Sequence, residues 1–315
     1  MNRKAIICGI KGSKLTTEVK NFLKSEKPWG VILFSRNIKN INQLKLLVNK
    51  IKFLMNDKKY PILIDQEGGQ VSRLNNILDF STFSQRYFGD LYQKKKNKFF
   101  QVYALYVSKV CEILNEVGIN INTVPVLDVV RKNTNKIIGS RSFSTKAQVV
   151  SCLGSICIDM FKKSRIGTVI KHIPGHGLSK IDTHNDISIV KEKKDKLMKK
   201  DFEPFKKCPS FFAMTAHIVY FKYDPYNTAT HSKIIIEKVI RKHIGFKGLL
   251  ISDDISMKSL KHGLLENAKR ALEAGCNLIL HCNGNIGEMR KLAKIVPRID
   301  KFTKEKTSHF YKFLG

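Results

Sequence analysis

Short apolar segments alternate with longer amphipathic segments along nearly the whole chain, and this alternation constrains the fold more than any other feature. The apolar, β-rich segments cover residues 5–10, 30–34, 61–64, 119–124, 167–170, 211–214, 248–251 and 276–280. Helix-compatible stretches cover residues 41–55, 96–117, 146–163, 193–205, 232–243 and 264–274. Eight strands with intervening helices predict an α/β fold, a closed (β/α)₈ barrel with the helices outside.

The alternation is less regular in its first units. The connection between the first two predicted strands is short, and a long irregular stretch runs from Asp65 to Gln85 before the next helix. We therefore expect a barrel that is irregular in its first βα units, with an open doubly wound sheet as the alternative. A chain of 315 residues suits one barrel, and no Pro-, Gly- or Ser-rich linker divides it. Residues 1–315 are predicted to form a single catalytic domain.

Charge and cysteine content narrow the classes of partner and compartment. The chain has 57 Lys and Arg against 26 Asp and Glu, a formal net charge of +31. Its lysines are spread out and accompany no aromatic ribonucleoprotein signature or Cys/His finger, so we expect loose attraction to polyanions but no specific nucleic-acid binding.

Seven cysteines without a Cys-x-x-Cys pair favour reduced thiols and a cytoplasmic location. Lys11 and Lys14 interrupt the first apolar run too early for a signal peptide, and no run reaches membrane-spanning length.

The densest group of chemically versatile side chains follows the apolar run 166–170. Within fourteen residues the chain carries Lys171, His172, His176, Asp182 and His184. Polar groups at the carboxyl end of a buried strand are where α/β proteins keep their chemistry. A carboxylate near a histidine can accept one ring proton and hold the other ring nitrogen toward a substrate. We therefore interpret Asp182 and His184 as an acid–base pair.

A metal site is the alternative for the same residues. A zinc helix of the His-x-x-x-His kind would carry His172 and His176 on one face, but Pro174 between them argues against a helix there. Ligation within a loop by these two histidines, Asp182 and His184 stays open, and with it a metal-dependent hydrolase. The interpretation that we favour requires no metal and no organic cofactor.

Unusual residues also stand at the ends of other predicted strands. Asp65 follows the third strand, Lys171 and His172 the fifth, His217 the sixth and Asp253 the seventh. Because the carboxyl ends of barrel strands converge on one mouth, we predict that these five side chains share one basin.

Asp253 and Asp254 are adjacent and need to be distinguished. Side chains alternate along a strand, so only one of the two should face the mouth if the strand persists that far. Spacing alone does not choose between them. One of the two could instead cap the helix that follows.

Several motifs together resemble glycoside hydrolase family 3. The segment 239–256, VIRKHIGFKGLLISDDIS, is similar to the nucleophile signature of that family, whose catalytic aspartate directly follows a serine, and the match falls on Asp253. The other motifs resemble the bacterial β-N-acetylglucosaminidase branch and occur in family order. They are IDQEGGQVSR (64–73), PVLD (125–128), GSRSF (139–143), KHIPGHG (171–177) with DTH (182–184), and TAH (215–217).

The resemblance implies a retaining exo-β-N-acetylglucosaminidase. Asp253 would attack the anomeric carbon, while His184, oriented by Asp182, would protonate the leaving oxygen and later deprotonate water. The implied substrate is a terminal β-linked GlcNAc, most plausibly on GlcNAc-1,6-anhydroMurNAc peptides in peptidoglycan recycling, hydrolysed by a cytoplasmic monomer. The sugar would be held by Asp65, Arg73, Arg141, Lys171 and His172.

Without the resemblance, simpler roles stay open for these residues. Asp65 and Arg73 could form a structural ion pair, and Arg141 could tie a loop to the barrel rim. Lys171 with His172 could balance buried carboxylates. A barrel that binds carbohydrate without hydrolysing it is a further alternative to catalysis.

Three more residues receive supporting or open roles. Asp128 lies within an apolar strand and is interpreted as support for the pocket, and His176 as a residue that fixes its loop. Glu67 could pass for a catalytic acid, but the two glycines after it indicate a tight turn, so its role stays open.

Overall fold

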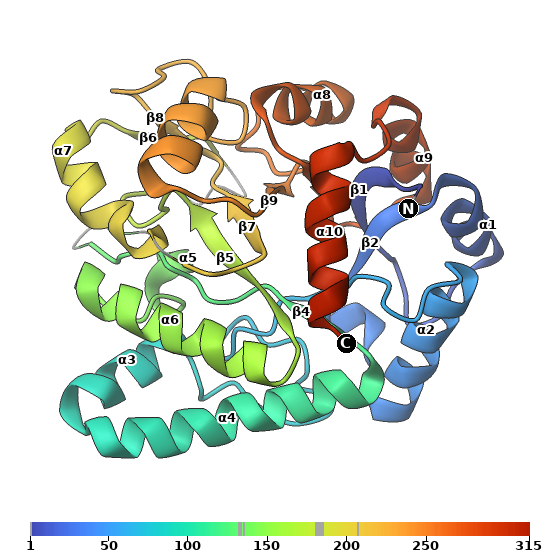
Figure 1. The fold of residues 1–315 in the computed structure, drawn as a ribbon, viewed down its shortest axis with the longest axis horizontal. Coiled ribbons are helices and arrows are strands. Elements are labelled where there is room, and N and C mark those ends of the chain that lie inside the picture. Colours follow the sequence, from blue (N-terminus) through green and yellow to red (C-terminus); the bar gives the residue numbers. More distant parts are fainter. Residues whose placement is uncertain (1, 132–133, 135, 180–185, 207) are drawn as a thin grey trace.

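Eight parallel strands close into a barrel that helices surround (Figure 1). The computed structural model describes residues 2–131, 134, 136–179, 186–206 and 208–315. Each barrel strand pairs in parallel with its neighbours in chain order, and the last strand pairs with the first. The predicted barrel is confirmed, with a strand at each predicted position. The barrel strands are β1 (Lys4–Gly9), β2 (Pro28–Leu33), β3 (Ile62–Ile64), β4 (Ile121–Asn122), β5 (Gly167–Ile173), β7 (Phe212–Thr215), β9 (Leu249–Asp254) and β10 (Leu278–His281).

Helices connect most of these strands and cover the outside of the barrel. The α-helices are α1 (Thr17–Glu26), α2 (Ile41–Leu54), α3 (Gln85–Lys94), α4 (Lys96–Val117), α5 (Lys136–Gly139), α6 (Ala147–Lys163), α7 (Lys194–Lys196), α8 (Leu264–Ala274), α9 (Ile286–Ile295) and α10 (Lys301–Phe313). Leu197–Asp201 and Ile235–Ile244 are π-helical, and Ser35–Asn37 and Glu203–Phe205 are 3₁₀ turns. None of the helices in these described ranges is long and apolar enough to cross a membrane.

The first connection is more regular than its sequence suggests. Between β1 and β2 the chain forms α1, whose first N–H groups are capped by the Thr16 hydroxyl, which accepts from Val19 N at 3.3 Å. Val19, Phe22 and Leu23 are buried at helical spacing. The connection is thus helical, while the expected irregularity of the first unit is found in the β1–β2 pairing, which shifts register between Lys4 and Ile7. The expected irregular stretch after β3 is confirmed, because the next helix begins at Gln85.

The helix expected over residues 193–205 is also different in the structure. It divides into α7, a π-helical turn and a 3₁₀ turn that contains Pro204. Proline has no backbone N–H to donate and clashes with the preceding turn, so a continuous helix cannot run through this position.

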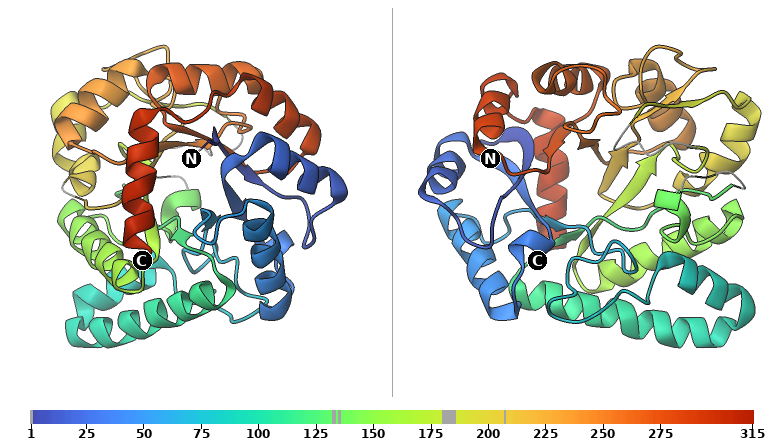
Figure 2. Two further views of the ribbon diagram at one scale, coloured as in Figure 1. Left: turned by 45° about the vertical axis from the view of Figure 1, so that its right-hand side comes forward. Right: turned by 180° about the vertical axis from the view of Figure 1, so that it is seen from behind.

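Helix α10 packs across the amino-terminal end of the barrel (Figures 1 and 2). The Phe310 ring lies 5.1 Å from the Phe212 ring at the start of β7, in an edge-to-face arrangement. The indole Nε1 of Trp29, at the start of β2, donates to Thr307 Oγ1 at 2.9 Å. These contacts close the end of the barrel opposite the carboxyl ends of the strands.

Two further strands lie outside the barrel. Strand β6 (Ser188–Val190) pairs in parallel with β8 (Ile218–Tyr220), and Ser188 is the partner of Ile218. Because β8 follows the carboxyl end of β7, this small sheet holds residue 188 close to the mouth of the barrel.

Candidate active site

The structure gathers the residues predicted at the strand ends around the mouth of the barrel. Lys171 of β5 contacts Asp65, which directly follows β3. The titratable neighbours of Asp253, in β9, include His217, His172 and Lys171. Side chains from four separate strands therefore meet at one end of the barrel, where loop variation builds the active sites of this fold.

Lys171 is the hub of a buried charge network. Its Nζ lies 2.6 Å from Glu67 Oε1 and 3.2 Å from Asp65 Oδ1, and it donates to Thr123 Oγ1 at 2.8 Å. The side chain of Lys171 is only 3% exposed. A buried ammonium is stable only when opposite charges and hydrogen bonds replace its hydration, and this set supplies both.

Asp65 is held in its ionised form by the same network. Burial alone would raise the pKa of its carboxyl group, but Lys171 and Arg73 more than offset burial and lower the pKa below its ordinary value. The Thr123 hydroxyl donates a further hydrogen bond to Asp65 Oδ1. The Asp65 carboxylate at the mouth therefore accepts hydrogen bonds and carries no proton that it could donate to a leaving group.

Arg73 approaches the same carboxylate from the loop after β3. Its Nη2 lies 3.7 Å from Asp65 Oδ2, and its guanidinium lies over the Phe34 ring at 5.5 Å. The Nε atom is buried without a hydrogen-bond partner among the described residues. The ion pair that was considered as a structural alternative therefore exists, but it is long and part of the guanidinium is uncommitted.

Glu67 pairs with Arg141 in a two-pronged ion pair. Arg141 Nε and Nη2 donate to the two carboxylate oxygens of Glu67, both at 2.8 Å. Burial opposes ionisation of Glu67, yet Arg141 and Lys171 lower its pKa to about 2. A carboxyl group with this pKa holds no proton near neutrality. The two-pronged pairing and the low pKa therefore favour a structural role for Glu67 over the role as catalytic acid that the sequence left open.

Asp128 fixes the backbone and the histidines that follow β5. Its Oδ2 accepts from His172 Nδ1 at 2.7 Å, and its Oδ1 accepts from the backbone N–H groups of His172 and His176 at 3.2 and 2.6 Å. With Nδ1 committed, Nε2 is the ring atom through which His172 can meet a ligand. Burial, assisted by His172, lowers the pKa of His176 to about 4, so His176 is neutral near pH 7.

The two adjacent aspartates of β9 do different things. Asp253 Oδ1 accepts from the backbone N–H of Asp254 at 2.8 Å. Burial opposes its ionisation, but His217, His172, this N–H and Lys171 lower its pKa below the ordinary value. The Asp254 carboxylate instead accepts from the backbone N–H and the hydroxyl of Ser256, at 3.1 and 2.8 Å. Asp254 caps a turn, and the suggestion that one of the pair caps the next helix is wrong, because that helix, α8, has Gly263 as its N-cap.

His217 has a role that sequence reasoning left open. Its Nε2 donates to the carbonyl oxygen of Asp254 at 3.0 Å, and its Nδ1 lies 2.7 Å from Thr230 Oγ1. Burial lowers the pKa of His217, which favours the neutral ring with its proton on Nε2. The Thr-Ala-His motif places this histidine at the mouth, but no signal in the sequence points to Thr230, thirteen residues further along.

Asp182 and His184 lie outside the described residues, so the structure does not place the predicted acid–base pair. The segments on either side of them are described. One continues from β5 through His176, and the other begins at residue 186 and enters β6. In the described part of the chain, no three His, Cys, Asp or Glu side chains gather as a metal site would require.

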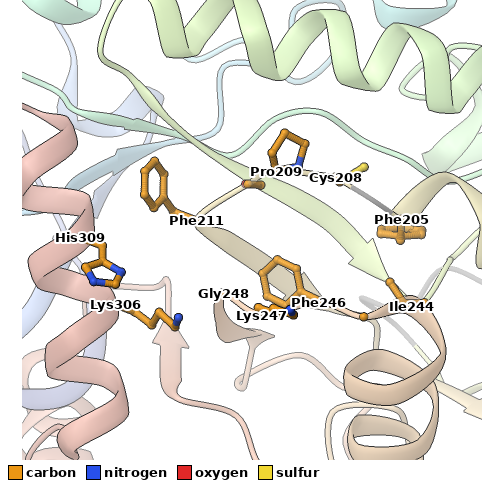
Figure 3. A pocket seen from close by; sticks show the side chains of 12 residues that line it. Phe205, Cys208, Pro209, Phe211, Ile244, Phe246, Lys247, Gly248, Lys306 and His309 are labelled. Carbon is orange, nitrogen blue, oxygen red and sulfur yellow. The ribbon is translucent and has the colours of Figure 1, made fainter.

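A pocket at the other end of the barrel does not belong to this site (Figure 3). It is lined by the residues that enter β7 and β9 and by α10. The mouth and this pocket are therefore separate features of the molecule.

Comparison with known proteins agrees with the fold and with the motifs. Residues 5–307 match the glycosyl hydrolase family 3 N terminal domain. The chain belongs to glycosyl hydrolase family 3. It is therefore a glycoside hydrolase, and the mouth of its barrel is where family 3 chemistry is expected.

Within family 3 the chain resembles β-hexosaminidases of the NagZ type. It is 35% identical over 269 residues to the β-hexosaminidase of Shewanella frigidimarina, which covers 82% of this chain and 76% of the relative. The crystal structure of NagZ from Neisseria gonorrhoeae in complex with N-trifluoroacetyl-D-glucosamine has a TM-score of 0.87 at 28% identity, covering 98% of this chain and 90% of that one. A family 3 β-N-acetylglucosaminidase from Paenibacillus sp. str. FPU-7 has a TM-score of 0.85 at 25% identity, and the chain spans 60% of its length.

Proposed function

We propose that this family 3 hydrolase removes a terminal β-linked N-acetylglucosamine with retention of configuration. Its natural substrates would be GlcNAc-1,6-anhydroMurNAc and the corresponding peptides, in peptidoglycan recycling. The observation that carries the proposal is the partly buried Asp253, held ionised beside a basin of fixed donors and acceptors. Similarity to β-hexosaminidases, one of them solved with an N-acylated glucosamine, supports the choice of sugar.

Asp253 is the proposed nucleophile. Its lowered pKa keeps it ionised at neutral pH, and the Asp254 N–H fixes one carboxylate oxygen. The carboxylate would attack the anomeric carbon as the bond to the leaving oxygen breaks, which gives a covalent glycosyl-enzyme. Water would then cleave this ester and release the sugar with its original configuration.

His184, oriented by Asp182, is the proposed acid and base. It would donate a proton to the leaving oxygen in the first step and take one from water in the second. An imidazole with an ordinary pKa of about 6.5 can do both near neutrality. A histidine suits this role because the neighbouring carboxyl groups of Asp65 and Glu67 are both held ionised and hold no proton to donate.

The charge network is the proposed sugar-binding surface. Asp65 would accept hydrogen bonds from sugar hydroxyls, while Lys171 and Arg73 would donate to hydroxyl or acetamido oxygens. His172 would use Nε2, since Asp128 occupies Nδ1. Arg141 completes the proposed contacts and is held in position by Glu67. Polar groups that are ordered before the sugar arrives reduce the entropy cost of binding.

We further propose that residues 1–315 act as one catalytic unit, as a monomer in the cytoplasm. All seven cysteines are free thiols, which suits a reducing compartment.

An aryl β-N-acetylglucosaminide tests the activity directly. We expect release of the aryl alcohol, unchanged by a chelator, with β-configured sugar as the first product by NMR. A 5-fluoro-N-acetylglucosaminyl fluoride should trap the intermediate, and peptide mass mapping should find the label on Asp253. Binding without turnover would favour the non-catalytic barrel, and loss of activity in chelator with stoichiometric zinc would favour the metal-dependent hydrolase. Parallel reactions with phosphate would distinguish phosphorolysis from hydrolysis.

A further inference from the structure

The pocket at the amino-terminal end of the barrel has the size of a small-molecule site. Its volume is about 410 Å³, and ligand pockets typically span about 300–1,000 Å³. It lies between the segments that enter β7 and β9 and helix α10 (Figure 3). It is separated from the mouth by the length of the barrel strands, so the proposed hydrolysis does not use it.

Three phenylalanine rings line the pocket, and one of them is held firmly against α10. They belong to Phe205, Phe211 and Phe246. The Phe211 ring packs on Phe310 and Phe313 of α10, with centroids 5.5 and 4.9 Å away. Phenylalanine rings that line a pocket favour an aromatic ring between them, because edge-to-face and offset contacts add about 0.5–1.5 kcal/mol to the burial of area.

The same pocket also carries basic side chains. Lys247, Lys306 and His309 line it, and none of its described lining residues is acidic. In Figure 3, Lys306 and His309 extend from α10 on the side opposite Phe205. The only ion pair described for Lys306 is a long one, in which Nζ lies 3.9 Å from Glu305 Oε1. The ammonium also lies over the Phe302 ring, 5.3 Å from its centroid, and a ligand carboxylate would be a stronger partner than either of these contacts.

We propose that this pocket binds a small aromatic carboxylate. The ring would lie among Phe205, Phe211 and Phe246, and the carboxylate would face Lys247 and Lys306. A neutral aromatic compound would satisfy only the phenylalanine rings. A short aliphatic acid would satisfy only the basic side chains.

Trp29 provides a built-in reporter for this pocket. It is the single tryptophan of the chain, and its indole bonds to Thr307, which lies between Lys306 and His309 on α10. Titration of the whole protein with 3-phenylpropionate should change the Trp29 emission with a saturable, one-to-one curve. A ligand of this size is expected to bind with a Kd of about 1 mM. 3-Phenylpropan-1-ol and butyrate should each bind at least about tenfold more weakly, because each lacks one of the two recognised groups.

Charge-removing variants test the location. Lys247→Gln combined with Lys306→Gln should weaken 3-phenylpropionate about tenfold and leave 3-phenylpropan-1-ol unchanged. Lys304→Gln is the matched control, because Lys304 is an exposed lysine on the same helix that does not line the pocket. Equal affinity for the acid and the alcohol, a curve that does not saturate, or equal weakening in the control would overturn the proposal. The readout does not depend on hydrolysis, so it stands or falls separately from the proposed function.

Discussion

The imidazole Nε2 of His217 donates to the backbone carbonyl of Asp254 at 3.0 Å and so links the end of β7 to the end of β9. Thr230 Oγ1, which also lies 2.8 Å from Thr215 Oγ1, meets the other ring nitrogen and sets the ring orientation. The accepting carbonyl belongs to Asp254, the residue that directly follows Asp253. His217 is therefore placed to position the proposed nucleophile through the backbone.

If His217 positions Asp253, breaking its support should lower kcat more than it raises KM. We expect Thr230→Val to reduce kcat about tenfold and His217→Asn about a hundredfold, since small displacements of a reacting group cost about that much. His217→Gln should recover part of the loss, because its amide can still donate to the Asp254 carbonyl. Thr228→Val is the control: the Thr228 hydroxyl is also buried, but it has no hydrogen-bond partner among the described residues. An equal loss in both threonine variants would show that general packing is responsible.

Replacing the two adjacent aspartates should have unequal effects. Asp253→Ala should abolish turnover, a loss of about 10⁴-fold or more, because no nucleophile remains. Asp254→Ala should leave measurable activity, since it removes a turn cap that involves Ser256. Steady-state rates on an aryl glycoside, with circular dichroism to verify folding, decide the point. Equal inactivation of two folded variants would contradict the assignment.

Glu67 should contribute to stability in a pH-dependent way. Its pKa falls from 4.5 to about 2 on folding. The contribution is therefore complete above about pH 4.5 and is lost as the pH falls toward 2. Glu67→Gln should lower the free energy of unfolding at pH 7 by about 3–5 kcal/mol, because it leaves Arg141 without its ionic partner and the buried Lys171 with Asp65 alone. The free energy of unfolding of this variant should also depend less on pH below about pH 4.5 than that of the unchanged protein.

Urea unfolding between pH 7 and pH 3 measures both effects. Glu112→Gln serves as the control, because Glu112 pairs with Lys109 at the surface and is 60% exposed. That substitution should cost less than about 1 kcal/mol at either pH. An unchanged pH dependence in Glu67→Gln would contradict the assigned pKa.

The proposed acid–base pair predicts a dependence on the leaving group. His184→Ala should lower the hydrolysis rate of glycosides with poor leaving groups far more than that of activated aryl glycosides. The aryl oxide of an activated glycoside is stable enough to leave without being protonated. Asp182→Asn should move the basic limb of the kcat/KM profile to lower pH, because the carboxylate stabilises the protonated imidazole. Rates across a series of aryl glycosides measure the first effect. A uniform loss across the series would argue against an acid role.

The sequence identifies the barrel strands well because their burial is nearly complete. All seven residues of β5 are buried, so the strand reads as an uninterrupted apolar run that continues into Lys171 and His172. Helix α1 is harder to see, because its buried stripe consists of only three residues among two lysines and two glutamates. The break near Pro204 could have been expected from proline alone.

The sequence predicts which residues lie at the mouth of the barrel, because they follow strand ends. It does not predict which of their side chains contact one another. Lys171 lies closer to Glu67 than to Asp65, and this choice depends on how the turn after β3 folds back. The link from His217 to Thr230 likewise joins side chains of different segments. The spacing of apolar residues indicates which face of a helix or strand is buried. Contacts between side chains of different segments depend instead on the conformations of the loops.

The pairing of β1 with β10 has a consequence during synthesis. Strand β1 leaves the ribosome long before β10 and finds this second neighbour only after residues 278–281 have emerged. Until then the nascent sheet keeps two open edges, which can recruit other chains. The excess of lysine and arginine, which makes nascent copies repel one another, would limit such association while the ring is incomplete.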